Sequence, residues 1–426
     1  MEHKKKFAFY THKGGVGKTS ILTTIAIKAV LEGKHVAVID CDPQLNSTSF
    51  LFRYGAPFHK GRGKILTFED FYNSVDTYYD AISKDSTMKT EEDLRVIREY
   101  DVGHTNVWDV IREARPAIGI VQSYRNLTAG GNEIGALVNT SGPNKAGGNG
   151  SLRLIAGHPM LGEIEYSLAA EVQARREDWN YSVRFQLLAD FLIEHYKLDM
   201  VFIDLSPSSS ILNQNIIMSS DYLIMPCTGD EYAYYSIRSI GKWLATWRRR
   251  YTQFATTPRV LTVVFNKYKR QNHNKEDFSV KSGNVTIYTS KAHLDYIQRI
   301  QDDKEGAIKH LLGSATAYLV NGFDYYDFPL ICEALSTFSK LSSVSRCCYD
   351  NIDYGFLRLT PTDHNTIAHL KMGFDLVWNK ILLTIPGSVQ VVIQPPVHIE
   401  RPVNDPDDSG DDLKPPSQGK RVKKTE

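Results

Sequence analysis

Long hydrophobic runs are missing from this chain of 426 residues. No stretch approaches the roughly 20 consecutive apolar residues that a membrane-spanning helix needs, so the sequence predicts no membrane span. Net charge is also small, because 50 lysine and arginine residues nearly balance 49 aspartate and glutamate residues and leave a formal charge of +1. A strong overall attraction to nucleic acid is therefore excluded, and any binding to DNA must come from a local basic patch.

Cysteine is scarce as well. The five cysteines have no metal-site spacing, and their odd number argues against a disulfide framework. This pattern favours a reducing compartment, so we expect a cytoplasmic protein. What the chain does have is length and a 42% share of hydrophobic residues, enough for one large or two average domains with a buried core.

Five short apolar runs are continuous rather than alternating, which is typical of parallel strands buried on both faces by helices. They cover residues 7–10, 36–39, 200–203, 222–225 and 260–265. Between the first two, apolar residues recur at helical spacing from Ile21 to Val30, and Gly33 follows as a stop signal. A strand, glycine loop, helix and strand make a βαβ unit, so we expect an α/β fold with a doubly wound, mostly parallel sheet.

The remaining segments suggest how the chain is divided. Helical patterns recur over 233–247 and 367–382, and a charged, helix-compatible run covers 90–100. The stretch 129–150 is rich in Gly and Asn and is expected to be a loop. We predict a core formed by 1–51 and 151–388, a partly flexible insertion over 52–150, and a disordered tail rich in Pro and charge over 389–426.

The most specific motif is Lys13-Gly14-Gly15-Val16-Gly17-Lys18-Thr19, between a predicted strand and a predicted helix. Glycines let successive N–H groups point at phosphate oxygens, and the helix N-terminus favours negative charge. Lys18 is expected to bind the β- and γ-phosphates and Thr19 to hold Mg²⁺, although His12 stands where the usual motif has glycine. The predicted nucleotide contacts are Gly14, Gly15, Val16, Gly17, Lys18, Thr19 and Ser20.

Carboxylates follow two later strands. Asp40-Cys41-Asp42-Pro43-Gln44 ends the second strand, and Asp204-Leu205-Ser206-Pro207 ends the run that starts at residue 200. A carboxylate at the carboxyl end of a central strand can reach Mg²⁺ beside bound phosphates, so Asp204 is a predicted metal ligand. Taken alone, the segment around Asp42 is also compatible with a polar turn that merely ends a strand.

Together these motifs resemble the ParA/MinD family of P-loop ATPases, whose deviant Walker A motif carries an extra lysine at the position of Lys13. The resemblance implies ATP and Mg²⁺ as cofactors, hydrolysis that is weak alone and stimulated by a partner, and a homodimer in which Lys13 reaches the other protomer's nucleotide. It implies that Asp42 positions the attacking water, that Asp40 supports the same loop, and that Asn266 recognises adenine. The expected catalytic residues are Lys13, Lys18 and Asp42, and the expected metal site is Thr19, Asp42 and Asp204.

Within the family, the ParA-type partition ATPases are most similar, because the chain has neither paired cluster-binding cysteines nor a basic amphipathic membrane helix at its end. Partition ATPases bind DNA non-specifically. The candidate DNA contacts are Arg248, Arg249, Arg250, Lys267, Lys269 and Arg270. The three arginines also end a predicted helix, where cations complement the helix dipole, so this second explanation stays open.

Two functions fit these observations. The chain could partition plasmid or chromosomal DNA with a ParB-like or other activating partner, which would associate it with the nucleoid. Alternatively, it could be the ATP-driven dimeric regulatory subunit of another assembly, with the insertion at 52–150 docking a protein effector. A ligase function, found in other relatives, lacks a substrate motif here. ATP-dependent, sequence-independent DNA binding would separate the first two functions.

Overall fold

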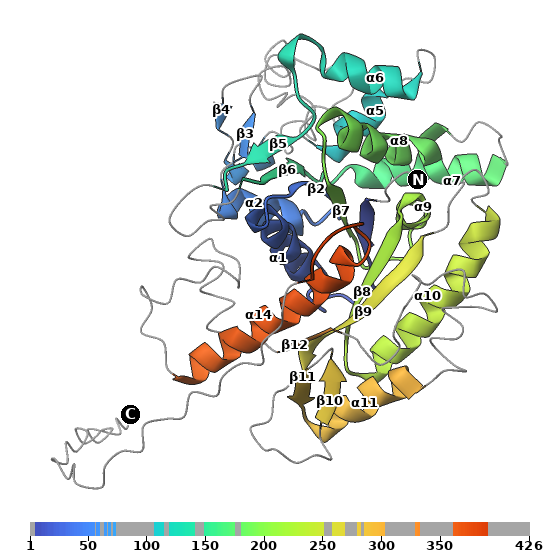
Figure 1. Ribbon diagram of the computed structural model, residues 1–426. Coiled ribbons are helices and arrows are strands. Elements are labelled where there is room, and N and C mark those ends of the chain that lie inside the picture. The colour runs from blue at the N-terminus through green and yellow to red at the C-terminus, as the bar shows by residue number, and fades with distance from the viewer. Residues whose placement is uncertain are drawn as a thin grey trace, which may run out of the picture.

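A ten-stranded sheet forms the centre of the computed structural model, in the order β12-β9-β8-β1-β7-β2-β6-β5-β3-β4 (Figure 1). The strands from β12 to β6 are parallel, and β5, β3 and β4 continue the sheet with antiparallel pairing. The structure describes residues 5–55, 57–59, 64–65, 67–69, 71–73, 106–114, 119–140, 149–174, 180–250, 258–268, 279–282, 285–302, 329–332 and 361–390.

All five predicted strands are confirmed at the centre of the sheet. They are β1 (Lys6–Phe9), β2 (His35–Cys41), β7 (Met200–Leu205), β8 (Tyr222–Thr228) and β9 (Arg259–Tyr268). The sheet also contains β6 (Ser151–Ile155), β12 (Leu330–Cys332), β5 (Ala136–Val138), β3 (Pro57–His59) and β4 (Lys64–Ile65). A separate hairpin pairs β10 (Ser279–Ser282) with β11 (Val285–Tyr288).

Helices surround this sheet. They are α1 (Lys18–Leu31), α2 (Asn46–Tyr54), α5 (Val107–Glu113), α6 (Ile120–Leu127), α7 (Leu161–Ala174), α8 (Asn180–His195), α9 (Ile211–Ser219), α10 (Glu231–Arg250), α11 (Lys291–Asp302) and α14 (Pro361–Leu382). The connection through α1 advances from β1 toward β6, whereas those through α9 and α10 advance toward β12. Right-handed crossovers in opposite directions place these helices on opposite faces, so the sheet is doubly wound as predicted.

The helices predicted near both ends of the core are confirmed, and they pack on each other. Figure 1 shows α1 and α14 together in front of the strands, and Lys28 of α1 forms an ion pair with Asp375 of α14. The chain leaves α1 through Gly33, whose φ of +77° continues the turn that ends the helix. With both α14 and α2 packed against α1, even Ile27 is fully buried.

The prediction of a loop over 129–150 is wrong at 136–138, where β5 pairs antiparallel with β6. This short segment forms a strand because an open sheet edge is available beside it. Gly135 enters the strand with a φ of +73°, and a Cβ at that position would lie 2.6 Å from the backbone oxygen of Leu154. The predicted domain boundaries stay predictions, and the run at 90–100 and the tail from 391 lie outside the described residues.

No helix in the described part of the chain is long and apolar enough to cross a membrane.

Candidate functional site

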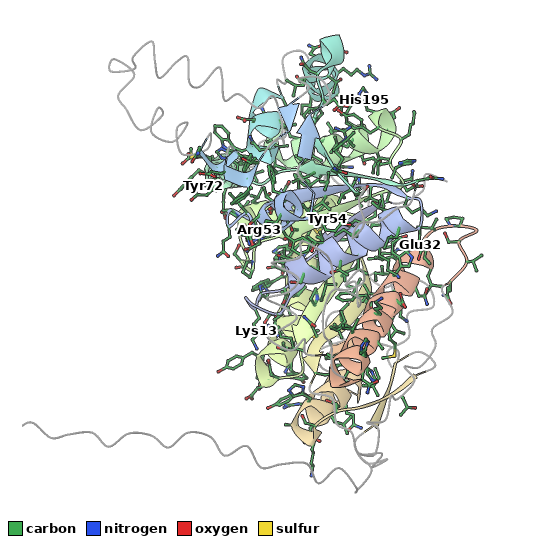
Figure 2. All side chains as sticks on the ribbon, turned by 90° about the vertical axis from the view of Figure 1, so that its left-hand side faces the viewer. Lys13, Glu32, Arg53, Tyr54, Tyr72 and His195 are labelled. Atoms are coloured by element: carbon green, nitrogen blue, oxygen red, sulfur yellow. The ribbon has the colours of Figure 1, made fainter. Side chains whose placement is uncertain are left out.

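The predicted nucleotide and metal residues lie in or beside the strand ends and loops at one edge of the sheet, where β1, β2, β7, β8 and β9 have their carboxyl ends. This edge is where open α/β sheets bind ligands. The phosphate loop leads from β1 into α1, and Figure 2 shows Lys13 and Glu32 at opposite ends of that helix. The motif therefore has the strand–loop–helix context that phosphate binding requires.

Glycine is needed in the phosphate loop for two reasons. Gly15 and Gly17 have φ angles of +73° and +87°, and a Cβ at residue 17 would overlap Nδ2 of Asn266. Gly17 is also the N-cap of α1 and supplies no side-chain cap. The first N–H groups of the helix are therefore not occupied by a capping side chain and can bind an anion.

Asp204 is the buried acceptor at the centre of the site. Its Oδ1 accepts a hydrogen bond from Nζ of Lys18, and its Oδ2 accepts one from Oγ1 of Thr19 at 2.8 Å and another from Oγ of Ser47. A carboxylate and a hydroxyl this close together suit Mg²⁺, which prefers oxygen ligands. Mg²⁺ keeps much of its hydration and its bonds to phosphate, so two protein oxygens are a fitting set.

Asp40 shapes the neighbouring loop that carries Asp42. Its Oδ1 accepts the N–H of Asp42 at 3.0 Å, and its Oδ2 accepts the N–H and hydroxyl of Thr48 at 2.9 and 2.7 Å. Burial, together with the negative charge of Asp204, raises the pKa of Asp40 to about 7. Burial also raises the pKa of Asp42, whose Oδ1 accepts the N–H of Gln44 at 3.0 Å.

Lys13 is held by its own chain. Its Nζ forms an ion pair with Oδ2 of Asp230 and lies 3.2 Å from Oγ1 of Thr228 and 5.7 Å from the centroid of the Tyr232 ring. Oδ1 of Asp230 accepts the N–H of Ala233 at 2.9 Å and thereby caps α10. Burial alone would raise the pKa of Asp230, but the bonds from Lys13, Thr228 and Ala233 outweigh it and lower that pKa.

His12, at the position where glycine is usual, links the phosphate loop to α10. Its Nδ1 lies 3.0 Å from the hydroxyl of Tyr10, which donates to the backbone oxygen of Ser208 at 2.7 Å. The imidazole also packs edge-to-face against Trp243 of α10, with 4.0 Å between the ring centroids. Burial lowers the pKa of His12 to about 4, so the imidazole is neutral near pH 7.

Asn266 and Lys267 brace the phosphate loop from β9. Nδ2 of Asn266 donates to the backbone oxygen of Val16 at 2.7 Å, and Nζ of Lys267 donates to that of Gly15 at 2.6 Å. Of the other predicted DNA contacts, Arg249 is exposed at the end of α10, and Lys269 and Arg270 lie outside the described residues. The backbone of Arg248 and Arg250 completes the helix.

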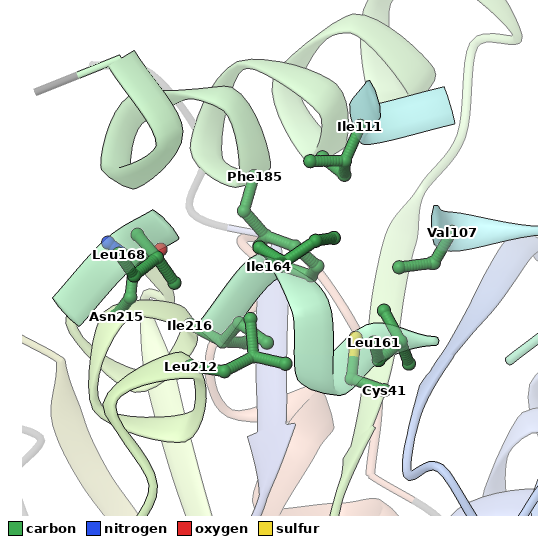
Figure 3. Close-up of a pocket in the computed structure, with 10 residues that line it drawn as sticks. All are labelled: Cys41, Val107, Ile111, Leu161, Ile164, Leu168, Phe185, Leu212, Asn215 and Ile216. Carbon is green, nitrogen blue, oxygen red and sulfur yellow. The ribbon is translucent and has the colours of Figure 1, made fainter. Parts of the chain in front are cut away.

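An apolar pocket lies between α7 and α9 (Figure 3). Its lining includes Leu161, Leu168 and Ile216 and the thiol of Cys41, whose pKa is raised well above its ordinary value by burial. Asn215 supplies an amide, and both polar atoms of that side chain are buried without a hydrogen-bond partner. Among the described residues that line it there is no cation for a phosphate, so the pocket is not the nucleotide site.

Three hydrogen-bond partners of Asp204 and Lys13 were not predicted from the sequence: Ser47, Thr228 and Asp230. Asp230 does carry a signal, since Asp directly before a helix is a common N-cap, but nothing in the sequence connects it to Lys13. Ser47 and Thr228 are ordinary small polar residues in the sequence, and only the fold brings them to Asp204 and Lys13.

Comparison with known proteins supports a nucleotide site. Residues 7–280 match the family described as CobQ/CobB/MinD/ParA nucleotide binding domain. "Uncharacterized protein MJECL24" of Methanocaldococcus jannaschii is 24% identical over 261 residues, which are 61% of this chain and 72% of that protein. A probable plasmid-partitioning protein ParA of Thermus thermophilus is 40% identical over 48 residues, 11% of this chain and 15% of the relative.

Among solved structures, the ATP complex of a McdA variant from Cyanothece aligns with a TM-score of 0.49 and 15% identity, over 92% of this chain and all of that one (100%). The structure of pNOB8 ParA bound to nonspecific DNA aligns with a TM-score of 0.48 and 16% identity, over 90% of this chain and 98% of the other.

Proposed function

Because this chain belongs to the CobQ/CobB/MinD/ParA nucleotide-binding family, we propose that it is a partition-type ATPase whose nucleotide state controls dimerisation and DNA binding. The observation that carries the proposal is the arrangement of Lys18 and Thr19. Both stand at the open N-terminus of α1, and both donate to the buried carboxylate of Asp204. A cation, a hydroxyl, a carboxylate and uncapped N–H groups are the parts that bind a metal–nucleoside triphosphate.

In the proposed mechanism, each residue has a separate task. The N–H groups of 14–20 hold the phosphates, and Lys18 leaves Asp204 to neutralise the β- and γ-phosphates. Thr19 and Asp204 would hold Mg²⁺, which would reduce the negative charge on the phosphate oxygens. Asp42 orients the attacking water from the loop that Asp40 fixes. Asn266, which donates to the backbone oxygen of Val16 in this structure, would recognise the base.

Dimerisation is the proposed output of this site. Lys13 would exchange Asp230 for phosphate oxygens of the nucleotide in the other protomer, and hydrolysis would remove the γ-phosphate on which that contact depends. The Lys13 side chain is 36% exposed in this structure, so it can reach outward without rearranging the core. The dimer would carry two copies of the basic end of α10.

We expect the Asp42→Ala protein to bind long non-specific duplex DNA with ATP and not with ADP. Removing the water-orienting carboxylate slows hydrolysis and so preserves the ATP dimer, and binding through phosphate contacts weakens steeply as salt rises. Fluorescence anisotropy across a salt series measures both effects. The matched control is Arg249→Ala in the same background, which should lower the slope of log K against log salt by about 0.9 for each phosphate that this arginine neutralises.

The second candidate function is an ATP-driven regulatory subunit of another protein assembly. It is favoured by the described part of the insertion, which adds β3, β4 and β5 to the sheet beside β6. An ATP dimer of Asp42→Ala that binds no DNA at low salt would contradict the partition proposal and favour this candidate. Light scattering in the same samples identifies the dimer.

A further inference from the structure

Ser47 is the third donor to the carboxylate of Asp204, and it comes from a different element than the other two. Lys18 and Thr19 belong to α1, whereas Ser47 lies in the first turn of α2. Ser47 and Asp204 are both fully buried, so water cannot replace this hydrogen bond. The hydroxyl of Ser47 thus joins the start of α2 to the carboxylate that faces the phosphate loop.

The position of Ser47 connects it to Asp42. The loop from Asp42 to Thr48 is fixed at both ends, because Asp40 accepts the N–H groups of both residues. Gly157 donates its N–H to the hydroxyl of Thr48 at 2.9 Å and holds the same turn from another side. Ser47 lies next to Thr48, one of these fixed points. The hydrogen bond from Ser47 therefore connects Asp204 to a short loop that is held at both ends.

We propose that Ser47 is a positioning residue that holds Asp204 in place when metal and nucleotide bind and couples that carboxylate to the loop of Asp42. The inference rests on the proposed function of the site. Binding of metal and nucleotide would draw Lys18 from Oδ1 to the phosphates. Thr19 would bind the metal through a lone pair of its hydroxyl oxygen, while its O–H could still donate to Oδ2 of Asp204. Of the three described donors to Asp204, Ser47 would then be the one that contacts neither the metal nor the nucleotide.

The two states of the site therefore depend on Ser47 to different degrees. Without nucleotide, an Ala at this position leaves Asp204 with two donors from α1. With metal and nucleotide bound and Lys18 drawn away, the same change would leave Asp204 with one of its three described donors, the hydroxyl of Thr19, whose oxygen also binds the metal. Weaker support of a buried charged group is costly. Ser47→Ala should therefore weaken the contribution of Mg²⁺ to nucleotide binding by about tenfold, with little effect on binding without the metal.

The test is a titration of the full-length protein with a fluorescent ATP analogue, once with Mg²⁺ and once with EDTA. In the wild type we expect Mg²⁺ to strengthen binding. In Ser47→Ala this strengthening should fall by about tenfold, while affinity in EDTA stays close to that of the wild type. A cooperative thermal transition, with a Tm somewhat lower because a buried hydrogen bond is lost, shows that the variant is folded. Ser49→Ala removes a hydroxyl two residues further along α2 and should behave like the wild type.

Ser47→Cys distinguishes the loss of the hydrogen bond from the loss of side-chain volume, since a thiol fills similar space but is only a weak donor. It should reproduce the loss seen in Ser47→Ala. An unchanged Mg²⁺ effect in both variants, or an equal loss in Mg²⁺ and in EDTA, would overturn the inference while leaving the nucleotide site intact. A wild-type protein that binds no ATP analogue in either condition would instead overturn the proposed function, and the inference with it.

Discussion

Two lysines of the phosphate loop, Lys13 and Lys18, each contact an aspartate of the same chain. Each aspartate thereby pairs with an ammonium group that is partly or fully buried. In the proposed mechanism, a nucleotide displaces Asp204 from Lys18, and a second protomer displaces Asp230 from Lys13. On that proposal the two aspartates oppose nucleotide binding and dimerisation, respectively, and tune how much nucleotide each step requires.

Asp230→Asn should strengthen ATP-dependent dimerisation by up to about fivefold, since a surface-accessible ion pair is worth up to ~1 kcal/mol and its removal frees Lys13. Asn still caps α10 through its side-chain oxygen, so stability should change little. Sedimentation at a series of protein concentrations measures the dimer constant. The control is Asp295→Asn on the exposed side of α11. Dimerisation weaker than in the wild type would refute this role of Asp230.

His12 gives the protein a defined response to acid. Its pKa is about 4 in the folded protein and about 6.5 in the unfolded chain, because burial disfavours the charged imidazolium. Between these values the unfolded chain binds more protons, so stability rises with pH up to about 6.5 and is lost as pH falls toward 4. After allowance for partial exposure, the loss should be about 1–2 kcal/mol.

Urea unfolding at about pH 7 and at about pH 4.5, compared between the wild type and His12→Gln, measures this contribution. Gln at this position has no charge to gain, so the variant should lose less stability over the same interval. Equal losses in both proteins would show that His12 does not set the pH response.

At the level of elements, α10 lies across the phosphate loop. Asp230, at its N-terminus, contacts Lys13, and Trp243, in its second half, contacts His12. At about 1.5 Å per residue, Asp230 and Trp243 are about 20 Å apart along the helix. The helix ends at Arg248–Arg250, so we expect one rigid element to connect the phosphate loop with the proposed DNA-binding end.

Trp243→Ala should weaken ATP binding by about three- to tenfold, because an aromatic contact of this kind is worth about 0.5–1.5 kcal/mol and here it steadies the loop beside Lys13. Isothermal titration calorimetry measures the affinity. Thr246→Ala, on the exposed side of the same helix, should have no effect. Unchanged affinity in Trp243→Ala would mean that α10 does not support the nucleotide site.

The elements that could be predicted from the sequence are those whose signal lies within one continuous segment of the chain. The five central strands are continuous apolar runs, and the phosphate loop and α1 follow one another directly, so spacing alone identifies them. In contrast, β6 contains Arg153, which is buried because its guanidinium donates to the backbone oxygen of Ile134 and stacks on Tyr196. The burial of this strand can be recognised only once the partners of Arg153 are known, and those partners are distant in the sequence.

For the whole molecule, membership of the ParA/MinD group of nucleotide-binding proteins was expected from three short motifs and is confirmed by the match over 7–280. The contacts that tune the site could not be predicted this way. Ser47 and Thr19 reach the same oxygen of Asp204, and Thr228 reaches Lys13, only because parallel strands bring separate loops to one edge of the sheet. Sequence spacing does not encode those distances.

The antiparallel strands beyond β6 also have a practical consequence for handling the protein. If β3, β4 and β5 were removed, one side of Ser151–Ile155 would expose unpaired N–H and C=O groups, and such an open edge promotes pairing between molecules. In the intact chain the sheet ends instead at β4, whose pairing covers two residues, one of them Lys64. Any version of the protein shortened in this region should therefore keep β3, β4 and β5 together, because β5 alone would expose the edge that β3 now covers.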